Sequence, residues 1–493
     1  MMPRISCKVV ILVCLVFLLF LGIYSRSRTE SELVHQSITK KGNADEITNV
    51  ENNFSTTSGE RQFIGLKHEK LESYPSRYYC NFPKPGEKAH IHEGEGYESD
   101  WNLKQVQVLI RHGDRSPLDF TLYRKQNLQP EFCNVFSDQA STSYAMLKDY
   151  RHSIMSDFNK AKLHPLSNVN LFAGPLPDSI LCAPGQLSTL GVIQQLHSGF
   201  MMRDTYLSKL KLDENMNESV HVQSTHVRRT FQSALAFLYG LLPEYHLEKV
   251  PIQIVYNALF CGPSCSCPQA KELEASVKKD QYKVYVQRQK QNATVQKVAS
   301  MLGIGDHTGS QIDAIVTGYL CKNIKLPCNT SGHCISNMDL DELMNEQEYM
   351  NSVTYSTSAA RQHSLLTIYP LLDLILQRMQ MATRKAHYAK KFFLYSAHDV
   401  TVRPMLVALG IPEYRWPRLA SRLVFELWEN KVGQHFIKIL FNGVDVTRQV
   451  SFCTKDADKP FCTYAMFEEF VSSGIAKLLG FKSRAEACLN IST

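Results

Sequence analysis

Three short segments of this chain carry residue types that could perform chemistry on an anion. In the first, His112 stands between Arg111 and Arg115, directly after the apolar run 106–110, which is typical of a buried strand. Guanidinium groups bind phosphate through paired hydrogen bonds, and an imidazole beside them is a suitable nucleophile toward the bound phosphorus. A basic surface loop would explain an Arg-His pair alone, but it would not explain the two segments that follow.

The other two segments have the same form. His398-Asp399 follows the apolar run 392–397, and Ser224-Thr225 ends a strand-like stretch with Arg228 and Arg229 just beyond it. In open α/β sheets, ligands bind beyond the carboxyl ends of the strands, so three such ends can converge on one anion. A single histidine at a strand end is more often a core residue, and the agreement among three segments favours a site.

These motifs resemble those of the histidine acid phosphatases. The residues that carry the resemblance are Arg111 to Pro117, Gly185 to Gly191, Ser224-Thr225 with Arg229-Thr230, and His398-Asp399, and it extends from about residue 102 to about residue 470. The resemblance implies an α/β fold, with a three-layer core around a mostly parallel central sheet. It also implies a mainly helical cap, formed by insertions at about 131–180 and 262–355.

The family resemblance further implies a metal-independent phosphoric monoester hydrolase that works through a phosphohistidine and needs no cofactor. His112 is then the nucleophile and Asp399 the proton donor. The implied phosphate ligands are Arg111, Arg115, Arg229 and His398. Arg228 could replace Arg229, which is preferred because it directly precedes Thr230. Asp399 must be protonated when the leaving group departs, which predicts catalysis under mildly acidic conditions.

The amino-terminal segment indicates a membrane anchor. Residues 9–24 are uncharged and almost wholly apolar, after a short tail at 1–8, and sixteen residues is near the lower limit for a span. A cleaved signal peptide is the alternative, but no small-x-small cleavage pattern follows, so we expect an uncleaved signal anchor. Residues 25–78 are polar and predict a flexible lumenal stem, which leaves 79–493 for the phosphatase domain.

Sequons and cysteines predict that the carboxyl-terminal bulk lies in the secretory lumen. Twelve of the fourteen cysteines lie beyond the apolar segment, an even number that suits an oxidising compartment. Cys453 and Cys462 are close enough to close a local loop. The cluster at 261–267 could hold zinc, but it lacks paired Cys-x-x-Cys elements, so disulfides are expected there. The candidate glycosylation sites are Asn53, Asn217, Asn292, Asn329 and Asn490.

Composition limits the class of partner. The chain has 493 residues, 44% hydrophobic and 20% charged, which is typical of a globular protein. Its net charge of +7 mildly favours acidic partners such as phosphorylated glycans, and no recognition module or long basic run indicates nucleic acid.

Anchor, length and overall similarity are most like the membrane-anchored Golgi members of the family. That likeness implies a single-pass type II protein of the Golgi membrane with a lumenal catalytic domain. The implied substrate is the 2-O-phosphate of xylose in the glycosaminoglycan linkage region of proteoglycan core proteins, with linkage-region glycosyltransferases as candidate partners.

Other functions remain open at the level of sequence. A broad-specificity acid phosphatase would use the same residues, as would a phosphatase of inositol polyphosphates or lysophosphatidate. A lipid substrate predicts an apolar channel in the cap, and an inositol polyphosphate predicts lysines around the mouth. A non-catalytic glycan-binding protein is a different class, and the complete catalytic set argues against it. A phosphate-transferring mutase does not suit a disulfide-rich, secreted-type chain.

Overall fold

A computed structural model gives the conformation of most of the chain beyond residue 75. The described residues are 76–82, 92–96, 100–119, 133, 142–163, 174–178, 182–255, 267–411, 413, 415–453 and 462–489. The expected tail at 1–8, the anchor at 9–24, most of the stem at 25–78, and the sequons Asn53 and Asn490 lie outside these residues. Within the described ranges, no helix has both the length and the apolar character needed to cross a membrane.

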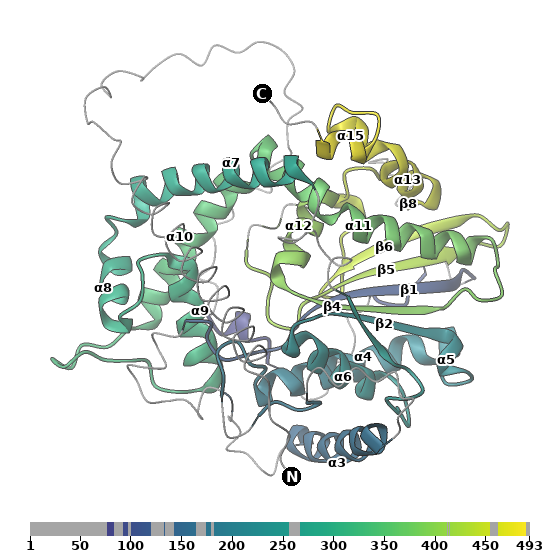
Figure 1. Cartoon of the computed structure of the whole chain (residues 1–493), viewed down its shortest axis with the longest axis horizontal. Coiled ribbons are helices and arrows are strands. Elements are labelled where there is room, and N and C mark those ends of the chain that lie inside the picture. The colour runs from purple at the N-terminus through teal and green to yellow at the C-terminus, as the bar shows by residue number, and fades with distance from the viewer. Residues whose placement is uncertain are drawn as a thin grey trace, which may run out of the picture. The chain divides into compact units, whose positions relative to one another are not determined.

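In the described part of the chain, eight strands form one mixed sheet (Figure 1), in the order β3-β2-β4-β1-β5-β6-β7, with β8 beside β6. Strands β3, β2, β4 and β1 run parallel, β5 pairs with β1 in the antiparallel direction, and β5 and β6 form an antiparallel hairpin. The strands are β1 (Asn102–Arg111), β2 (Val220–Thr225), β3 (Ile252–Val255), β4 (Phe392–Ala397), β5 (Arg422–Glu429), β6 (His435–Phe441), β7 (Val444–Asp445) and β8 (Cys462–Thr463).

Helices cover both faces of the sheet, which gives the expected three-layer α/β core (Figure 1). Because strand side chains alternate between faces, Val108 of β1 packs toward α4 (Thr189–Leu210) and α6 (Arg228–Leu241), whereas Leu109 packs toward α11 and α12. Helices α11 (Ser358–Thr383) and α12 (Asp399–Leu409) share their layer with the carboxyl-terminal helices α13 (Tyr464–Glu469), α14 (Ile475–Leu478) and α15 (Arg484–Leu489).

The two expected insertions lie in different places. From the first, α3 (Thr142–Leu163) packs on the outside of α4 through apolar side chains such as Leu147 and Ile154. The second contains α7 (Pro268–Val284), η2 (Tyr285–Gln289), α8 (Ala293–Leu302), α9 (Thr308–Gly318), η3 (Leu320–Lys322) and α10 (Asn337–Tyr355). Helices α8, α9 and α10 share an apolar core of their own. We call the residues of these six elements the helical cap.

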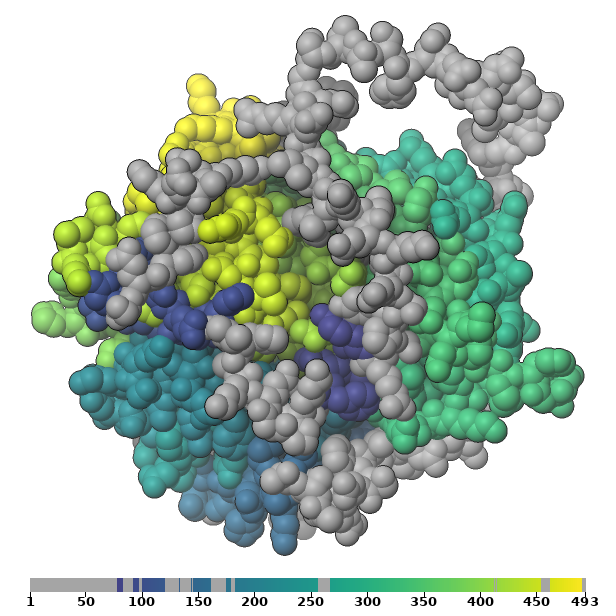
Figure 2. Space-filling model, turned by 180° about the vertical axis from the view of Figure 1, so that it is seen from behind, coloured from purple at the N-terminus to yellow at the C-terminus, as the bar shows by residue number. Residues whose placement is uncertain are grey.

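The amino-terminal turn η1 (Ser76–Cys80) links the cap to the sheet. Cys80 forms a disulfide with Cys321 of η3, and Tyr79 packs into the apolar core of the cap. The Tyr79 carbonyl also accepts the backbone N–H of Leu419, which lies just before β5. Figure 2 shows these earliest described residues, in purple, between the green cap and the yellow-green carboxyl-terminal half of the sheet.

Four further disulfides join described cysteines. The predicted local loop between Cys453 and Cys462 is closed by a disulfide, and Cys267 pairs with Cys488, so this member of the 261–267 cluster is not a zinc ligand. The remaining pairs are Cys133–Cys182 and Cys328–Cys334. The other cysteines of that cluster, Cys261 and Cys265, lie outside the described residues.

Candidate active site

The parallel strands bring the three segments singled out in the sequence to one place. Strand β4 lies between β1 and β2, and the register pairs Arg111 with Ala397 and Ser224 with Ser396. The chain therefore leaves all three strands at the same edge. His112 and His398 meet there with their ring centroids 5.6 Å apart.

The hydrogen bonding of His112 fixes which of its ring nitrogens carries the proton. Its Nδ1 lies 2.8 Å from the carbonyl oxygen of Gly113, so Nδ1 carries the proton and donates it to that carbonyl. Nε2 consequently keeps its lone pair. Burial lowers the pKa of His112 well below its usual value, and the cations of Arg229, Arg111 and Arg115 lower it further. The imidazole is thus neutral over the ordinary pH range.

Three guanidinium groups surround this imidazole. Arg111 donates to the Pro417 carbonyl at 2.5 Å, and Arg229 lies 3.4 Å from the Nδ1 atom of His398. Burial lowers the pKa of Arg229 to about 10, and electrostatic repulsion from the Arg115 cation contributes to this shift. The adjacent Arg228 is exposed, so only Arg229 points its charge into the site. The Nε atoms of Arg111, Arg115 and Arg229 are buried without a hydrogen-bond partner among the described residues, and a phosphate oxygen could accept from them.

His398 is the amino-terminal cap residue of α12, and a chain of hydroxyl groups orients it. Its Nε2 lies 2.9 Å from Thr225 Oγ1, which is 2.7 Å from Thr230 Oγ1, and Thr230 in turn donates to the Val227 carbonyl. With Nε2–H donating to Thr225, the other nitrogen faces Arg229 as an acceptor. Burial, and then the Arg229 charge, lower the pKa of His398 to about 3, so this ring is also neutral.

Asp399 is the first residue of α12 and faces the same cations. Its Oδ2 accepts from Arg111 at 3.2 Å and from the indole Nε1 of Trp416 at 2.5 Å. Burial raises the pKa of Asp399, but the charges of Arg111 and Arg115 and the Trp416 hydrogen bond outweigh it and hold that pKa below its usual range. Asp399 is therefore ionised beside these guanidinium groups.

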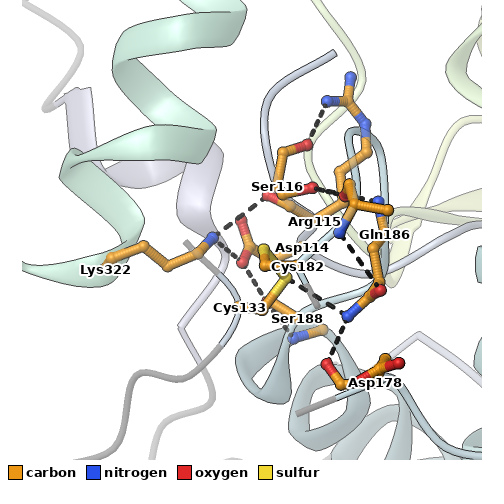
Figure 3. The surroundings of a disulfide bond; sticks show 11 residues. Asp114, Arg115, Ser116, Cys133, Asp178, Cys182, Gln186, Ser188 and Lys322 are labelled. Atoms are coloured by element: carbon orange, nitrogen blue, oxygen red, sulfur yellow. Dashed lines mark hydrogen bonds and ion pairs between the residues drawn. A yellow bond between two sulfur atoms is a disulfide. The ribbon is translucent and has the colours of Figure 1, made fainter. Parts of the chain in front are cut away.

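The helical cap reaches the catalytic loop, residues 112–117, through two ion pairs that the sequence did not indicate. Asp313 of α9 binds Arg115 through two hydrogen bonds, at 2.7 and 3.2 Å. Lys322 of η3 forms a fully buried ion pair with Asp114, whose carboxylate also accepts from Ser188. Figure 3 shows Asp114 between Lys322 and Ser188, near the Cys133–Cys182 disulfide.

Close backbone packing fixes the other side of the loop. A Cβ atom added at Gly113 would lie 2.3 Å from the Gly191 carbonyl oxygen, so the loop can rest on α4 only with glycine at that position. The sequence pattern predicts a helix from residue 184, yet α4 begins at Thr189. Gly185 adopts a positive φ, and the Gln186 carbonyl accepts the backbone N–H of Ser116 at 2.9 Å. Residues 185–187 are therefore outside the helix and lie along the catalytic loop, to which they are hydrogen-bonded.

No group of three or more His, Cys, Asp and Glu side chains within the described ranges is arranged to hold a metal ion. The site residues that the sequence did not predict are Asp313, Lys322 and Trp416. They come from the cap and from the segment before β5, outside every recognisable motif, so no local signal could have found them.

Comparisons with known proteins identify the family of this chain. Residues 102–442 match the family described as the histidine phosphatase superfamily (branch 2). The chain is 33% identical to 2-phosphoxylose phosphatase 1 of Homo sapiens, over 83% of this chain and 84% of that protein. The corresponding protein of Xenopus tropicalis is 32% identical, over 84% and 82%.

Among solved structures, the multiple inositol polyphosphate phosphatase of Bifidobacterium longum in complex with inositol hexasulfate has a TM-score of 0.48 and 14% identity. The match covers 81% of this chain and 98% of that one. The family match spans all three strand ends and the segments between them. The chain therefore belongs to branch 2 of the histidine phosphatase superfamily and is a phosphoric monoester hydrolase of the histidine phosphatase type.

Proposed function

We propose that this chain removes the 2-O-phosphate of xylose in the glycosaminoglycan–protein linkage region and so supports glycosaminoglycan synthesis on proteoglycans. The observation that carries the chemistry is a neutral, oriented imidazole at His112 among three guanidinium groups, of which those of Arg111 and Arg115 are buried. The sugar substrate is supported by relatives named 2-phosphoxylose phosphatase 1, which share about a third of their residues with most of this chain.

In the proposed first step, Arg111, Arg115 and Arg229 bind the phosphate dianion and relieve their mutual repulsion. The Nε2 lone pair of His112 attacks phosphorus in line, so that a P–N bond forms while the P–O bond to the sugar breaks. The guanidinium groups stabilise the charge that builds on the phosphoryl oxygens, and one such contact can be worth about 3 kcal/mol. His398 is proposed as a fourth ligand, once the bound dianion favours its protonated form.

The sugar leaves as a poor alkoxide unless it receives a proton, and Asp399 is the proposed donor. Before substrate binds, the charges of Arg111 and Arg115 keep Asp399 ionised. A bound phosphate dianion offsets those two charges and raises the pKa of the carboxyl. Substrate binding and proton uptake are therefore coupled, which agrees with catalysis under mildly acidic conditions. Water then hydrolyses the phosphohistidine, and His112 returns to its neutral form.

We also propose that the chain is a single-pass type II protein of the Golgi membrane. Residues 1–8 would be the cytoplasmic tail, 9–24 the signal anchor, 25–78 the stem and 79–493 the lumenal phosphatase domain. Five disulfides among the described cysteines support an oxidising compartment. A phosphorylated glycan is the proposed partner, with linkage-region glycosyltransferases as further candidates.

The described sequons differ in how ready they are for glycosylation. Asn217 in α5 (Met216–Ser219) and Asn329, inside the loop closed by Cys328–Cys334, are exposed. Asn292 caps α8, and its side-chain nitrogen donates to Glu342 at 3.0 Å. A glycan on Asn292 would compete with that contact, so we propose Asn217 and Asn329 as the better acceptors.

The test compares the full-length wild-type chain with His112→Ala on two substrates, linkage tetrasaccharide carrying 2-phosphoxylose and an aryl phosphate. We expect phosphate release from both, abolished in the variant. His387→Ala, an exposed histidine in the turn after α11, is the matched control and should retain activity. Release from the aryl phosphate alone would favour a broad-specificity phosphatase, or one acting on inositol polyphosphates or lysophosphatidate. No release from either would favour a non-catalytic glycan-binding protein.

A further inference from the structure

One aromatic residue contacts both a proposed phosphate ligand and the proposed proton donor. The indole Nε1 of Trp416 donates to Asp399 Oδ2 at 2.5 Å, and the guanidinium carbon of Arg111 lies 5.7 Å from the centre of the indole ring. The next residue, Pro417, supplies the carbonyl that accepts from Arg111 at 2.5 Å. These two consecutive residues thus orient both partners of the Arg111–Asp399 ion pair.

Trp416 itself is fixed from the cap side. Its backbone N–H donates to the Tyr79 hydroxyl at 3.2 Å, and its side chain packs against the apolar core shared by α8, α9 and α10. Tyr79 in turn lies beside Cys80, which the disulfide to Cys321 attaches to η3. The indole is therefore held by Tyr79 and the apolar core of the cap on one side, and it donates to the carboxylate of Asp399 on the other.

The two oxygens of Asp399 are not equivalent. Oδ2 accepts from both Trp416 and Arg111, whereas the only donor to Oδ1 among the described residues is the backbone N–H of Val400, at 2.9 Å. A carboxyl group protonates most readily on the oxygen with fewer donors. Oδ1 is then the oxygen that can carry a transferable proton, and Oδ2 is the oxygen that Trp416 holds in place.

We propose that Trp416 is a positioning residue for general-acid catalysis, holding Oδ2 of Asp399 so that the proton on Oδ1 faces the leaving oxygen. The inference rests on the proposed function of Asp399. As the P–O bond breaks, the proton passes from Oδ1 to the departing oxygen and a carboxylate forms. The indole N–H stabilises this carboxylate, because hydrogen bonds to charged groups are stronger than those to neutral ones.

This role depends on the leaving group. An alkoxide needs the proton as the bond breaks, whereas an aryl oxide such as 4-nitrophenolate leaves without it. A residue that acts through the proton donor should therefore matter for an alkyl phosphate and matter little for an aryl phosphate. A residue that only supports the fold should affect both substrates alike.

The test measures kcat/KM of full-length chains on glycerol 2-phosphate and on 4-nitrophenyl phosphate. Trp416→Phe keeps an aromatic ring beside Arg111 and removes the N–H donor. We expect kcat/KM to fall about tenfold for the alkyl ester, the size of one charge-assisted hydrogen bond, and less than about threefold for the aryl ester. Trp428→Phe is the matched control, because Trp428 also donates its indole N–H to a buried carboxylate, Glu426 at 2.8 Å, within β5.

Two further readouts separate positioning from folding. In an Asp399→Asn background, Trp416→Phe should have no additional effect on glycerol 2-phosphate, because no proton remains to be positioned. In the single variant, loss of the donor raises the pKa of Asp399, so the basic limb of the pH profile at saturating alkyl ester should shift to higher pH. If Trp416→Phe does not fold, Trp416→Leu repeats the comparison.

Equal losses on both substrates, or a Trp416→Phe profile like that of Trp428→Phe, would overturn the inference while leaving the proposed function intact. A full additional loss in the Asp399→Asn background would also overturn it. A wild-type chain that releases phosphate neither from these esters nor from the linkage tetrasaccharide would instead remove the proposed function itself. Because glycerol 2-phosphate contains no sugar, these results do not depend on the xylose assignment.

Discussion

The buried pair of Lys322 and Asp114 offers a quantitative test of how the cap holds the catalytic loop. Both side chains are fully buried. Lys322 also lies 3.3 Å from the Arg115 carbonyl, and Asp114 Oδ2 accepts from Ser188. Asp114 Oδ1 has no hydrogen-bond partner within the described ranges. Among the described residues, Lys322 is therefore the only cation that forms an ion pair with this carboxylate.

Removing one partner of such a pair leaves an isolated buried charge, which typically costs about 3 to 5 kcal/mol. We expect Lys322→Met to lower the free energy of unfolding by that amount, since Met preserves much of the side-chain volume. Asp114→Asn should cost less. Burial already lowers the pKa of Lys322, against the opposing effect of Asp114, so without Asp114 the amine can lose its proton and avoid carrying a buried charge.

The double variant distinguishes this reasoning from a simple packing effect. With both charges removed, no isolated charge remains, so the cost should be smaller than the sum of the two single costs by about 0.5 to 3 kcal/mol. Urea unfolding with disulfides intact measures this. With a slope of about 3 kcal/mol per molar, Lys322→Met should move the midpoint by about 1 M. The same variant should lower kcat/KM, because Asp114 adjoins Arg115, a proposed phosphate ligand.

Lys278→Met is the matched control for the buried pair. Lys278 binds Glu274 at 2.6 Å on the surface of α7, where both side chains are about half exposed or more. Exposed pairs contribute little, so its cost should stay below about 0.5 kcal/mol. A cost below about 1 kcal/mol for Lys322→Met, or strictly additive costs in the double variant, would refute the argument that this ion pair anchors the loop.

Three further outcomes follow from the geometry of the site. Burial and the neighbouring cations hold the pKa of His112 well below its usual value, so the rate of phosphoenzyme formation should not fall through protonation of His112 as the pH is lowered through the usual range of a histidine. Thr225→Val removes the hydrogen bond to His398 while nearly preserving shape, and kcat/KM should fall about tenfold, whereas an unchanged value would show that Thr225 does not orient the ring. Gly113→Ala places a Cβ 2.3 Å from the Gly191 carbonyl oxygen and should destabilise the chain by about 1 to 3 kcal/mol or more, measured by urea unfolding.

Local patterns predicted the parts of the fold that depend on neighbouring residues. The apolar run 392–397 before His398 is strand β4, with the same bounds. The carboxyl ends of β1, β2 and β4 meet because parallel pairing aligns them. The amino-terminal boundary of α4 was placed too early, because residues 185–187 exchange helical hydrogen bonds for contacts with the catalytic loop.

Long-range partners could not be predicted in this way. Asp313 lies 198 positions from Arg115, and Lys322 lies 208 positions from Asp114, so no periodicity or motif connects them. Trp416 is only 17 positions from Asp399, but it follows α12 in an irregular segment without a repeating pattern. Such contacts arise when the cap and the sheet pack together, and the sequence of either segment alone contains no trace of them.

The charges around the phosphate site explain why substrate binding and acid catalysis should be linked. Arg111, Arg115 and Arg229 contribute three positive charges, while Asp399 and the cap residue Asp313 contribute two negative ones, which leaves the site with one positive charge. A phosphate dianion reverses this to one negative charge. In a buried site, this excess negative charge favours proton uptake, both at His398 and at Asp399, the carboxyl whose cations the dianion engages. Asp313 therefore has an electrostatic role as well as a positioning one. Without Asp313 the site would carry two positive charges, and binding of the dianion alone would neutralise them. The proton needed by the leaving sugar would then be less strongly recruited.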